Sequence, residues 1–191
     1  TGVFSGPLGS MQGQHRFNRE SVVREVQRNR ITYTPTYGYF ETRLKGVNVP
    51  GNHVALWMIG YEDVPENSSE ICICEIFGKH TTETSSKVGV GVHPFGDPRI
   101  VDDFQEIELP IDITEFHVYA AEWTPTHIDF YVDNKLIRTV KQSPGYPMQF
   151  MLGIYERPKE TVPAAAGAQS LYPKKFVVDY VRAYQPVDGY R

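Results

Sequence analysis

Cysteine is scarce in this chain: only Cys72 and Cys74 occur among 191 residues. Two cysteines cannot build the multi-bridge framework that holds many small secreted domains together. A C-x-C pair also supplies too few ligands for a metal ion, and no histidine stands close to it in the sequence. We therefore expect no metal site there and interpret both residues as small hydrophobic side chains of a buried strand.

Long apolar runs and an excess of positive charge are also absent. No run approaches the ~18 apolar residues that a membrane-spanning helix needs, so we expect no membrane partner. The net charge is −4, and the basic stretch from Arg16 to Arg30 is interrupted by Glu20 and Glu25. Because binding to phosphate backbones requires clustered lysine and arginine, nucleic acid is not an expected partner either.

Aromatic residues are abundant, with 12 Tyr and 10 Phe, whereas helical periodicity is nearly missing. Short alternating or apolar runs recur between Gly, Pro, Asn and Asp, a pattern typical of antiparallel sandwiches and barrels. The length suits one core, so we expect residues 1–191 to form a single all-β domain, an antiparallel β-sandwich. The expected strands lie within residues 37–47, 53–61, 87–93, 115–123, 127–140, 148–156 and 175–185, with a two-residue turn at Asp133-Asn134.

A further strand, in the segment SSEICICEIFG at 68–78, has a glutamate at each end of an apolar run. On a regular strand Glu70 and Glu75 would point to opposite faces, because they are five residues apart. Glu75 would then be buried among isoleucines, which is unfavourable for an unpaired carboxylate. A β-bulge near Ile73-Cys74 removes the conflict, because one extra residue re-aims the side chains after it. One face then carries Glu70, Cys72 and Glu75, and the other carries Ile71, Ile73 or Cys74, and Ile76.

The bulged geometry also brings the two carboxyl groups within reach of each other. The glutamates become four strand positions apart, about 13 Å between Cα atoms at ~3.3 Å per residue, and side chains that lean together reduce this to roughly 6 Å. Retaining glycoside hydrolases hold two carboxyl groups ~5–5.5 Å apart. One of them is an ionised nucleophile, and the other is an acid whose pKa is raised by burial and by its neighbour's charge.

The motif E-I-C-I-C-E resembles the E-I-D-x-x-E signature of glycoside hydrolase family 16, the laminarinase and lichenase group. Four other segments are similar to strands of the same family: YGYFETRLK, VPGNHVALWMIG, FHVYAAEWTPTHIDFYVDNKLIRTV and FVVDYVRAYQ. The likeness covers residues 20–185. It implies a concanavalin A-like β-jelly roll whose concave face forms an open glycan-binding cleft.

The resemblance also implies roles for individual residues. Glu70 matches the family's nucleophile and Glu75 its acid/base, and Cys72 stands between them where the family has Asp. Glu41 and Arg43 match a pair that reaches substrate hydroxyls near the cleavage point, the alternative being a surface salt bridge. Further substrate contacts are expected at Trp57, for which core packing is the alternative, and at His93 and Tyr155.

Two other positions are interpreted through the same resemblance. Trp123, in EWTP, is expected in the core. Asp179 matches a position near a structural calcium ion in many members, although the sequence shows no matching acidic partner for it. No cofactor is expected to be required.

Three departures from the family pattern bear on the substrate and on catalysis. Cysteine is a weak hydrogen-bond donor, whereas the Asp that Cys72 replaces hydrogen-bonds the family's nucleophile. The segment DVPENSS, at 63–69, stands where the family has a tryptophan. Gly153 replaces an asparagine of the family.

These observations lead to one preferred function and two alternatives. The preferred function is that of a retaining endo-β-glycosidase acting on a polysaccharide, a β-1,3-linked or mixed β-1,3/1,4-linked glucan first and a β-galactan next. One alternative is a lectin-like, glycan-binding jelly roll whose catalysis is weakened by Cys72. The other is a sandwich without a ligand. We expect a monomer. The resemblance favours an extracellular protein, whereas the lack of a recognisable secretory signal and the unpaired cysteines also allow the cytoplasm.

Overall fold

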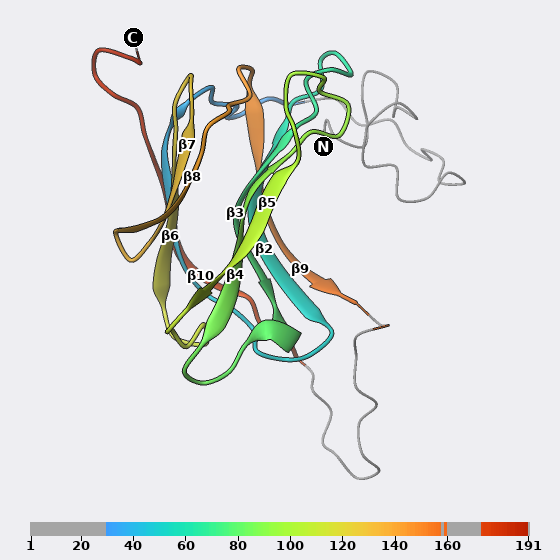
Figure 1. Cartoon of the computed structure of the whole chain (residues 1–191), viewed down its shortest axis with the longest axis vertical. Coiled ribbons are helices and arrows are strands. Elements are labelled where there is room, and N and C mark those ends of the chain that lie inside the picture. The colour runs from blue at the N-terminus through green and yellow to red at the C-terminus, as the bar shows by residue number, and fades with distance from the viewer. Residues whose placement is uncertain (1–29, 158, 160–172, 191) are drawn as a thin grey trace.

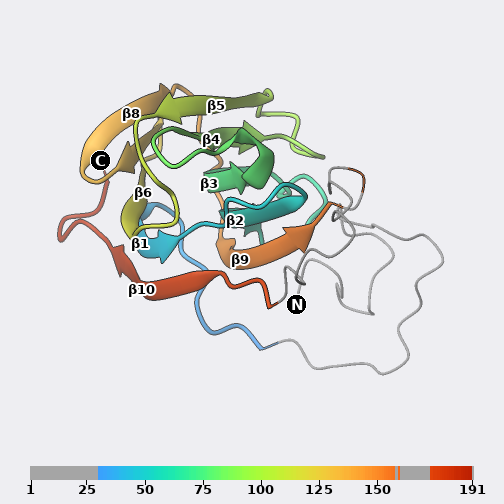
Figure 2. The same cartoon turned by 90° about the horizontal axis from the view of Figure 1, so that it is seen from below.

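The computed structural model describes residues 30–157, 159 and 173–190. Within these ranges the chain forms two five-stranded antiparallel sheets that pack face to face (Figures 1 and 2). The all-β sandwich expected from the sequence is therefore confirmed. The single-domain prediction for residues 1–191 extends beyond the described residues. No helix in the described ranges is long and apolar enough to cross a membrane.

The first sheet has the strand order β10-β1-β6-β7-β8, and the second has the order β5-β4-β3-β2-β9. The strands of the first sheet are β1 (Gly38–Lys45), β6 (His117–Trp123), β7 (Ile128–Val132), β8 (Lys135–Val140) and β10 (Val177–Tyr184). The strands of the second are β2 (Asn52–Gly60), β3 (Glu70–Phe77), β4 (Ser86–His93), β5 (Asp103–Leu109) and β9 (Met148–Glu156). A short 3-10 helix, η1 (Gly78–His80), follows β3.

The hairpin between β7 and β8 has the predicted two-residue turn. Asp133 and Asn134 both adopt positive φ, 48° and 62°. Asn and Asp tolerate this left-handed conformation better than other non-glycine residues, and it matches the twist of the flanking strands. The two turn residues are therefore the ones predicted from the sequence.

Strand β5 was not expected from the sequence. Its residues, DFQEIEL, are half-buried or exposed, and none is fully buried. Among the described strands it pairs with β4 and lies at the edge of the second sheet. Edge strands often carry charged side chains, which discourage pairing with other chains. In β5 such charged residues hide the apolar pattern by which a strand is recognised in a sequence.

The core lies between the sheets and is filled by alternate residues of each strand. From β1, Phe40 and Leu44 point into it, and both are at most 1% exposed. Trp123 of β6 is also fully buried, as expected, and its indole N–H donates to Ser143 Oγ at 2.9 Å and to the carbonyl oxygen of Pro144 at 3.0 Å.

The second sheet has a separate apolar strip on its outer face. On β2, Ala55, Trp57 and Ile59 form this strip together with Met151 of β9, whereas the residues between them face the core. In Figure 1 the strands of this sheet bow, and their concave side faces away from the first sheet. The concave side of the second sheet is therefore the face of β2, β3 and β9 that the core does not use.

Candidate active site

Strand β3 contains an extra residue between its two glutamates. The consecutive β2 residues Leu56 and Trp57 face Cys74 and Cys72, so Ile73 is additional to the pairing. The register between β3 and β4 shifts in the same place. The β-bulge predicted from the hydrophobic pattern is thus confirmed.

The bulge separates the side chains of β3 into the two expected faces. The members of the core are Ile71, Ile73, Cys74 and Ile76. On the opposite face, Cys72 Sγ lies 4.0 Å from Glu70 Oε2, between the two glutamates. Both cysteines are free thiols, as expected.

A pocket of about 350 Å³ opens on this outer face, and both Glu70 and Glu75 line it. Its volume falls in the ~300–1,000 Å³ range of ligand sites. The remaining lining residues come from β2 and from β9 with the residue after it: His53, Ala55, Trp57, Tyr155, Glu156 and Arg157. The structure therefore brings two of the predicted sugar contacts, Trp57 and Tyr155, to the two glutamates.

The two aromatic side chains differ in how they can meet a ligand. Trp57 is only 9% exposed and belongs to the apolar strip. It therefore packs against its neighbours and also lines the pocket. Tyr155 is 40% exposed and lines the pocket. An aromatic ring can stack against the apolar C–H groups of a sugar.

The ring of Tyr155 occupies the space beside Gly153. A Cβ at position 153 would lie 2.5 Å from the Tyr155 ring carbon Cζ and from its hydroxyl oxygen. This explains physically why the sequence has glycine where a larger residue was expected. The aromatic ring takes the room that an asparagine side chain would need.

Glu70 is 7% exposed. Burial raises the pKa of Glu70 to about 8, and the charge of Glu75 contributes in the same direction. The surroundings therefore favour the protonated form of the Glu70 carboxyl group.

Glu75 differs because it has a histidine partner. His53 Nε2 lies 3.2 Å from Glu75 Oε2. Burial alone would raise the pKa of Glu75, but the contacts with His53 and Cys72 outweigh it and lower this pKa below its ordinary value. The imidazole is held in place by stacking on Phe77, with ring centroids 4.3 Å apart and an interplanar angle of 12°.

The surroundings therefore shift the two carboxyl groups in opposite directions: the pKa of Glu70 is raised and that of Glu75 is lowered. The resemblance implies the opposite distribution for catalysis, an ionised Glu70 and a protonated Glu75. His53 is the main contact that stabilises charge on Glu75. Sequence reasoning did not identify His53, although its two-residue spacing from Ala55 and Trp57 places all three on one strand face.

His93 pairs with Glu70 across β3 and β4 and is 28% exposed at its side chain. Its Nδ1 lies 3.0 Å from Asp102 Oδ2, and its ring stacks on Phe104 with centroids 5.1 Å apart. One ligand atom each from Glu70, Cys72 and His93 lie within 4.8 Å of one another. The sequence shows no histidine close to Cys72, but the pairing of neighbouring strands brings His93 to it from 21 residues away in the chain.

A buried polar network holds the segment that enters β3. Asp97 Oδ2 accepts hydrogen bonds from Tyr146 Oη at 2.8 Å and from Ser69 Oγ at 3.2 Å. Tyr146 Oη in turn accepts the backbone N–H of Ser69 at 2.8 Å, and Arg99 Nε donates to Asp97 Oδ1 at 2.7 Å. Ser69 directly precedes Glu70, so the network fixes where the first glutamate begins its strand.

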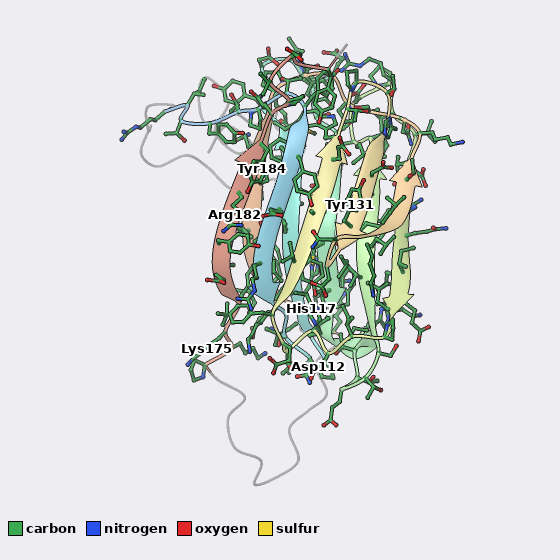
Figure 3. All side chains as sticks on the ribbon, turned by 90° about the vertical axis from the view of Figure 1, so that its left-hand side faces the viewer. Asp112, His117, Tyr131, Lys175, Arg182 and Tyr184 are labelled. Carbon is green, nitrogen blue, oxygen red and sulfur yellow. The ribbon has the colours of Figure 1, made fainter. Side chains whose placement is uncertain are left out.

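Glu41 and Arg43 are not brought to the pocket. They project from β1 on the outer face of the first sheet, alternating with the core residues Phe40 and Leu44. Glu41 Oε1 lies 3.4 Å from Arg182 Nη1, and Figure 3 shows Arg182 on this face. The expectation that the two residues contact sugar beside the glutamates is corrected accordingly, because β1 belongs to the other sheet.

Asp179, the residue expected near calcium, lies on the same outer face of the first sheet. Its Oδ2 accepts a hydrogen bond from Arg43 Nη1 at 2.5 Å. Among the described residues, one cluster of three or more side chains has metal-ligating geometry, and Asp179 is not part of it.

Fold and site together define the class of the protein: an antiparallel jelly-roll sandwich with a pair of carboxyl groups in an open groove, the arrangement of carboxylate-pair glycoside hydrolases. The sequence profile of the glycosyl hydrolases family 16 matches residues 25–180. The chain belongs to this family.

Three similar proteins are described by the names of different glycosidases. A β-glucanase of Rhodothermus marinus is 30% identical over 191 residues, which cover 86% of this chain and 62% of that protein. The structure of a GlcNAcα1-4Gal-releasing endo-β-galactosidase from Clostridium perfringens is 33% identical, covers 93% of this chain and 45% of its own, and superposes with a TM-score of 0.71. A laminarinase from Flavobacterium sp. UMI-01 is 26% identical, with coverages of 80% and 68% and a TM-score of 0.63. The chain thus spans less than two thirds of the first two relatives.

Proposed function

We propose that the protein is a retaining endo-β-glycosidase that cleaves a β-linked polysaccharide by double displacement. The observation that carries this proposal is that Glu70 and Glu75, from one bulged strand, line the same pocket. Two carboxyl groups in one groove supply the nucleophile and the acid/base that glycosidic bond cleavage needs. Membership in family 16 supports the same chemistry.

In the proposed mechanism the Glu70 carboxylate attacks the anomeric carbon while Glu75 protonates the leaving glycosidic oxygen. The bond from the anomeric carbon to that oxygen breaks, and an ester between the sugar and Glu70 forms. Glu75, now ionised, then removes a proton from a water molecule, which attacks the same carbon and releases Glu70. At the end of the cycle the two carboxyl groups together hold one proton again, as at the start.

These roles require the shared proton to lie on Glu75 in the reactive complex, whereas the surroundings in the free protein raise the pKa of Glu70 and lower that of Glu75. The alternative assignment exchanges the roles, with Glu75 as the nucleophile and Glu70 as the acid. A mechanism-based inactivator, a 2-deoxy-2-fluoro glycoside, distinguishes the two. It leaves the sugar covalently attached to the nucleophile, and peptide mapping identifies whether this is Glu70 or Glu75.

Two substrate classes are proposed, each supported by a particular observation. β-1,3-linked or mixed β-1,3/1,4-linked glucan comes first, because the relative from Rhodothermus marinus, which matches 86% of this chain, carries the name β-glucanase. A β-galactoside comes second, because the Clostridium endo-β-galactosidase shares 33% identity over nearly the whole chain. The Tyr155 ring beside Gly153 is where the groove departs from the family pattern of the sequence.

The test is an assay of reducing ends released from laminarin, lichenan and a β-galactan. We expect wild-type protein to release them from one of the three, and Glu70→Gln to lower the rate at least about a thousandfold, roughly 4 kcal/mol in activation free energy. If wild-type protein binds one of these glycans without releasing reducing ends, the lectin-like alternative replaces the enzyme. Recovery of turnover in Cys72→Asp would then assign the lost activity to position 72.

A further inference from the structure

We propose that Glu70, Cys72 and His93 form a binding site for a thiophilic divalent cation, with zinc as the best-suited ion. Occupation of this site would block catalysis reversibly, because the ion would occupy Glu70. The metal site itself is argued from the geometry, and its inhibitory effect rests on the proposed function.

The strand register assembles the three ligands. Glu70 and Cys72 are two residues apart on the groove side of β3, and His93 on β4 pairs directly with Glu70. One carboxylate oxygen, the Cys72 sulfur and one ring nitrogen of His93 lie within 4.8 Å of one another. A tetrahedral zinc ion with bonds of ~2.0–2.3 Å needs its ligand atoms about 3.3–3.8 Å apart. Side-chain rotations that move these atoms by about 1 Å close the difference.

One of the three ligands already has a carboxylate partner that orients it. His93 Nδ1 contacts the Asp102 carboxylate at 3.0 Å, so Nε2 is the nitrogen that remains for a metal. Stacking on Phe104 restricts the ring plane. Histidines that bind metals commonly donate their other N–H to a carboxylate in this way, which orients the ring and increases its basicity.

The donor set determines which ion is suited. A thiolate together with an imidazole selects zinc and other soft ions, whereas carboxylate oxygens alone suit magnesium or calcium. Cysteine stands here in place of the aspartate of the E-I-D-x-x-E signature, so this chain has a donor that such a signature lacks. Three protein ligands with an open fourth position are the arrangement of an accessible zinc site, as opposed to a closed structural one.

An ion can reach the site from the groove. Cys72 is fully buried, but Glu70 lines the pocket and the His93 side chain is 28% exposed. The thiol must lose its proton when the metal binds, so binding releases protons and weakens as the pH falls. We therefore expect reversible binding, with access from the side on which Glu70 lines the pocket.

The test uses Co²⁺ as a spectroscopic probe on the chelator-treated, full-length protein. We expect wild-type protein to develop a thiolate-to-cobalt charge-transfer band that Zn²⁺ removes by competition. Cys74→Ser is the matched control: Cys74 is an equally buried thiol two residues away that faces the core, so this variant should keep the band. Cys72→Ser should lose it, and His93→Gln should weaken Zn²⁺ binding beyond the ~10–100-fold that loss of a supporting partner such as Asp102 causes.

Absence of the band in folded wild-type protein, or its persistence in Cys72→Ser, overturns the proposal. Should Cys72→Ser fail to fold, loss of Zn²⁺ affinity in His93→Gln and Asp102→Asn decides in its place. Activity is measured separately, in chelator and then with added Zn²⁺. A band without any glycan cleavage in chelator would support the metal site while contradicting the glycosidase.

Discussion

His53 Nε2 lies 3.2 Å from Glu75 Oε2, on the neighbouring strand and in the same pocket. This contact favours the ionised form of Glu75 and lowers its pKa. Burial is the larger cause of the raised pKa of Glu70, and the charge of Glu75 adds to it. A residue of β2, outside the strand that holds both acids, therefore contributes to the difference between them.

The first prediction concerns this histidine. His53→Gln removes the main interaction that lowers the pKa of Glu75, while Glu70 and Cys72 on β3 and His93 on β4 still face it. The pKa of Glu75 then rises, so the pair takes up its second proton at a higher pH. We expect the acidic limb of kcat/KM to move to higher pH and the alkaline limb, near the pKa of about 8 of Glu70, to remain. The profile is measured in chelator, and an unchanged acidic limb would contradict the role of His53.

The second prediction concerns Tyr155 and Gly153. Gly153→Ala places a Cβ within the Tyr155 ring, so the ring must leave its position. Loss of a stacking face worth ~0.5–1.5 kcal/mol should raise KM about 2- to 12-fold with little change in kcat. Tyr155→Ala should have the same effect, and the double variant should be no worse than either single one. Additive effects in this double-mutant cycle would show that the two positions act separately.

The third prediction concerns the bulge. Deletion of Ile73 removes the extra residue, and regular alternation then keeps Glu70, Cys72 and Glu75 on the groove face. We expect this variant to stay folded by circular dichroism and to lose about 2–5 kcal/mol of stability, because one buried isoleucine is gone. Ile73→Val is the control, because it keeps the extra residue and should cost only ~0.5–1.5 kcal/mol. A deletion variant that does not fold, beside a folded Ile73→Val variant, is the result that this view of β3 does not permit.

The fourth prediction concerns Asp97. Burial alone would raise the pKa of Asp97, but hydrogen bonds from Arg99 and Tyr146 outweigh it and lower this pKa. Its stabilising effect is therefore full above the unfolded-state pKa of ~3.9 and is lost as the pH falls through the lower folded-state value. Asp97→Asn should reduce the free energy of unfolding in urea by about 1–3 kcal/mol at pH ~7. The difference from wild type should shrink below pH ~4, and a constant difference across this range would exclude the titration of Asp97 as its cause.

Part of this site could be predicted from the sequence because it depends on local pattern. The bulge could be inferred from the conflict between a five-residue spacing and the apolar residues between Glu70 and Glu75, and the turn at Asp133-Asn134 from its residue types. Strand β5 could not be predicted in the same way, because its position at a sheet edge replaces apolar residues with charged ones.

Other features depended on which strands become neighbours. Glu41 and Arg43 alternate as groove residues would, but alternation alone does not reveal to which sheet a strand belongs. The position of His93 near Cys72 likewise arises from the pairing of β3 with β4. The link between Asp97 and Ser69 joins residues 28 apart through a loop, and no local pattern indicates it.

Among the described residues of β2, the side chains of the outer face are separate from those of the core. Along β2, each residue that lines the groove is followed by one that packs against the first sheet. Mutation of the groove therefore leaves the packing between the layers largely untouched. Such a scaffold lets natural or laboratory selection explore new sugar preferences at little risk to folding.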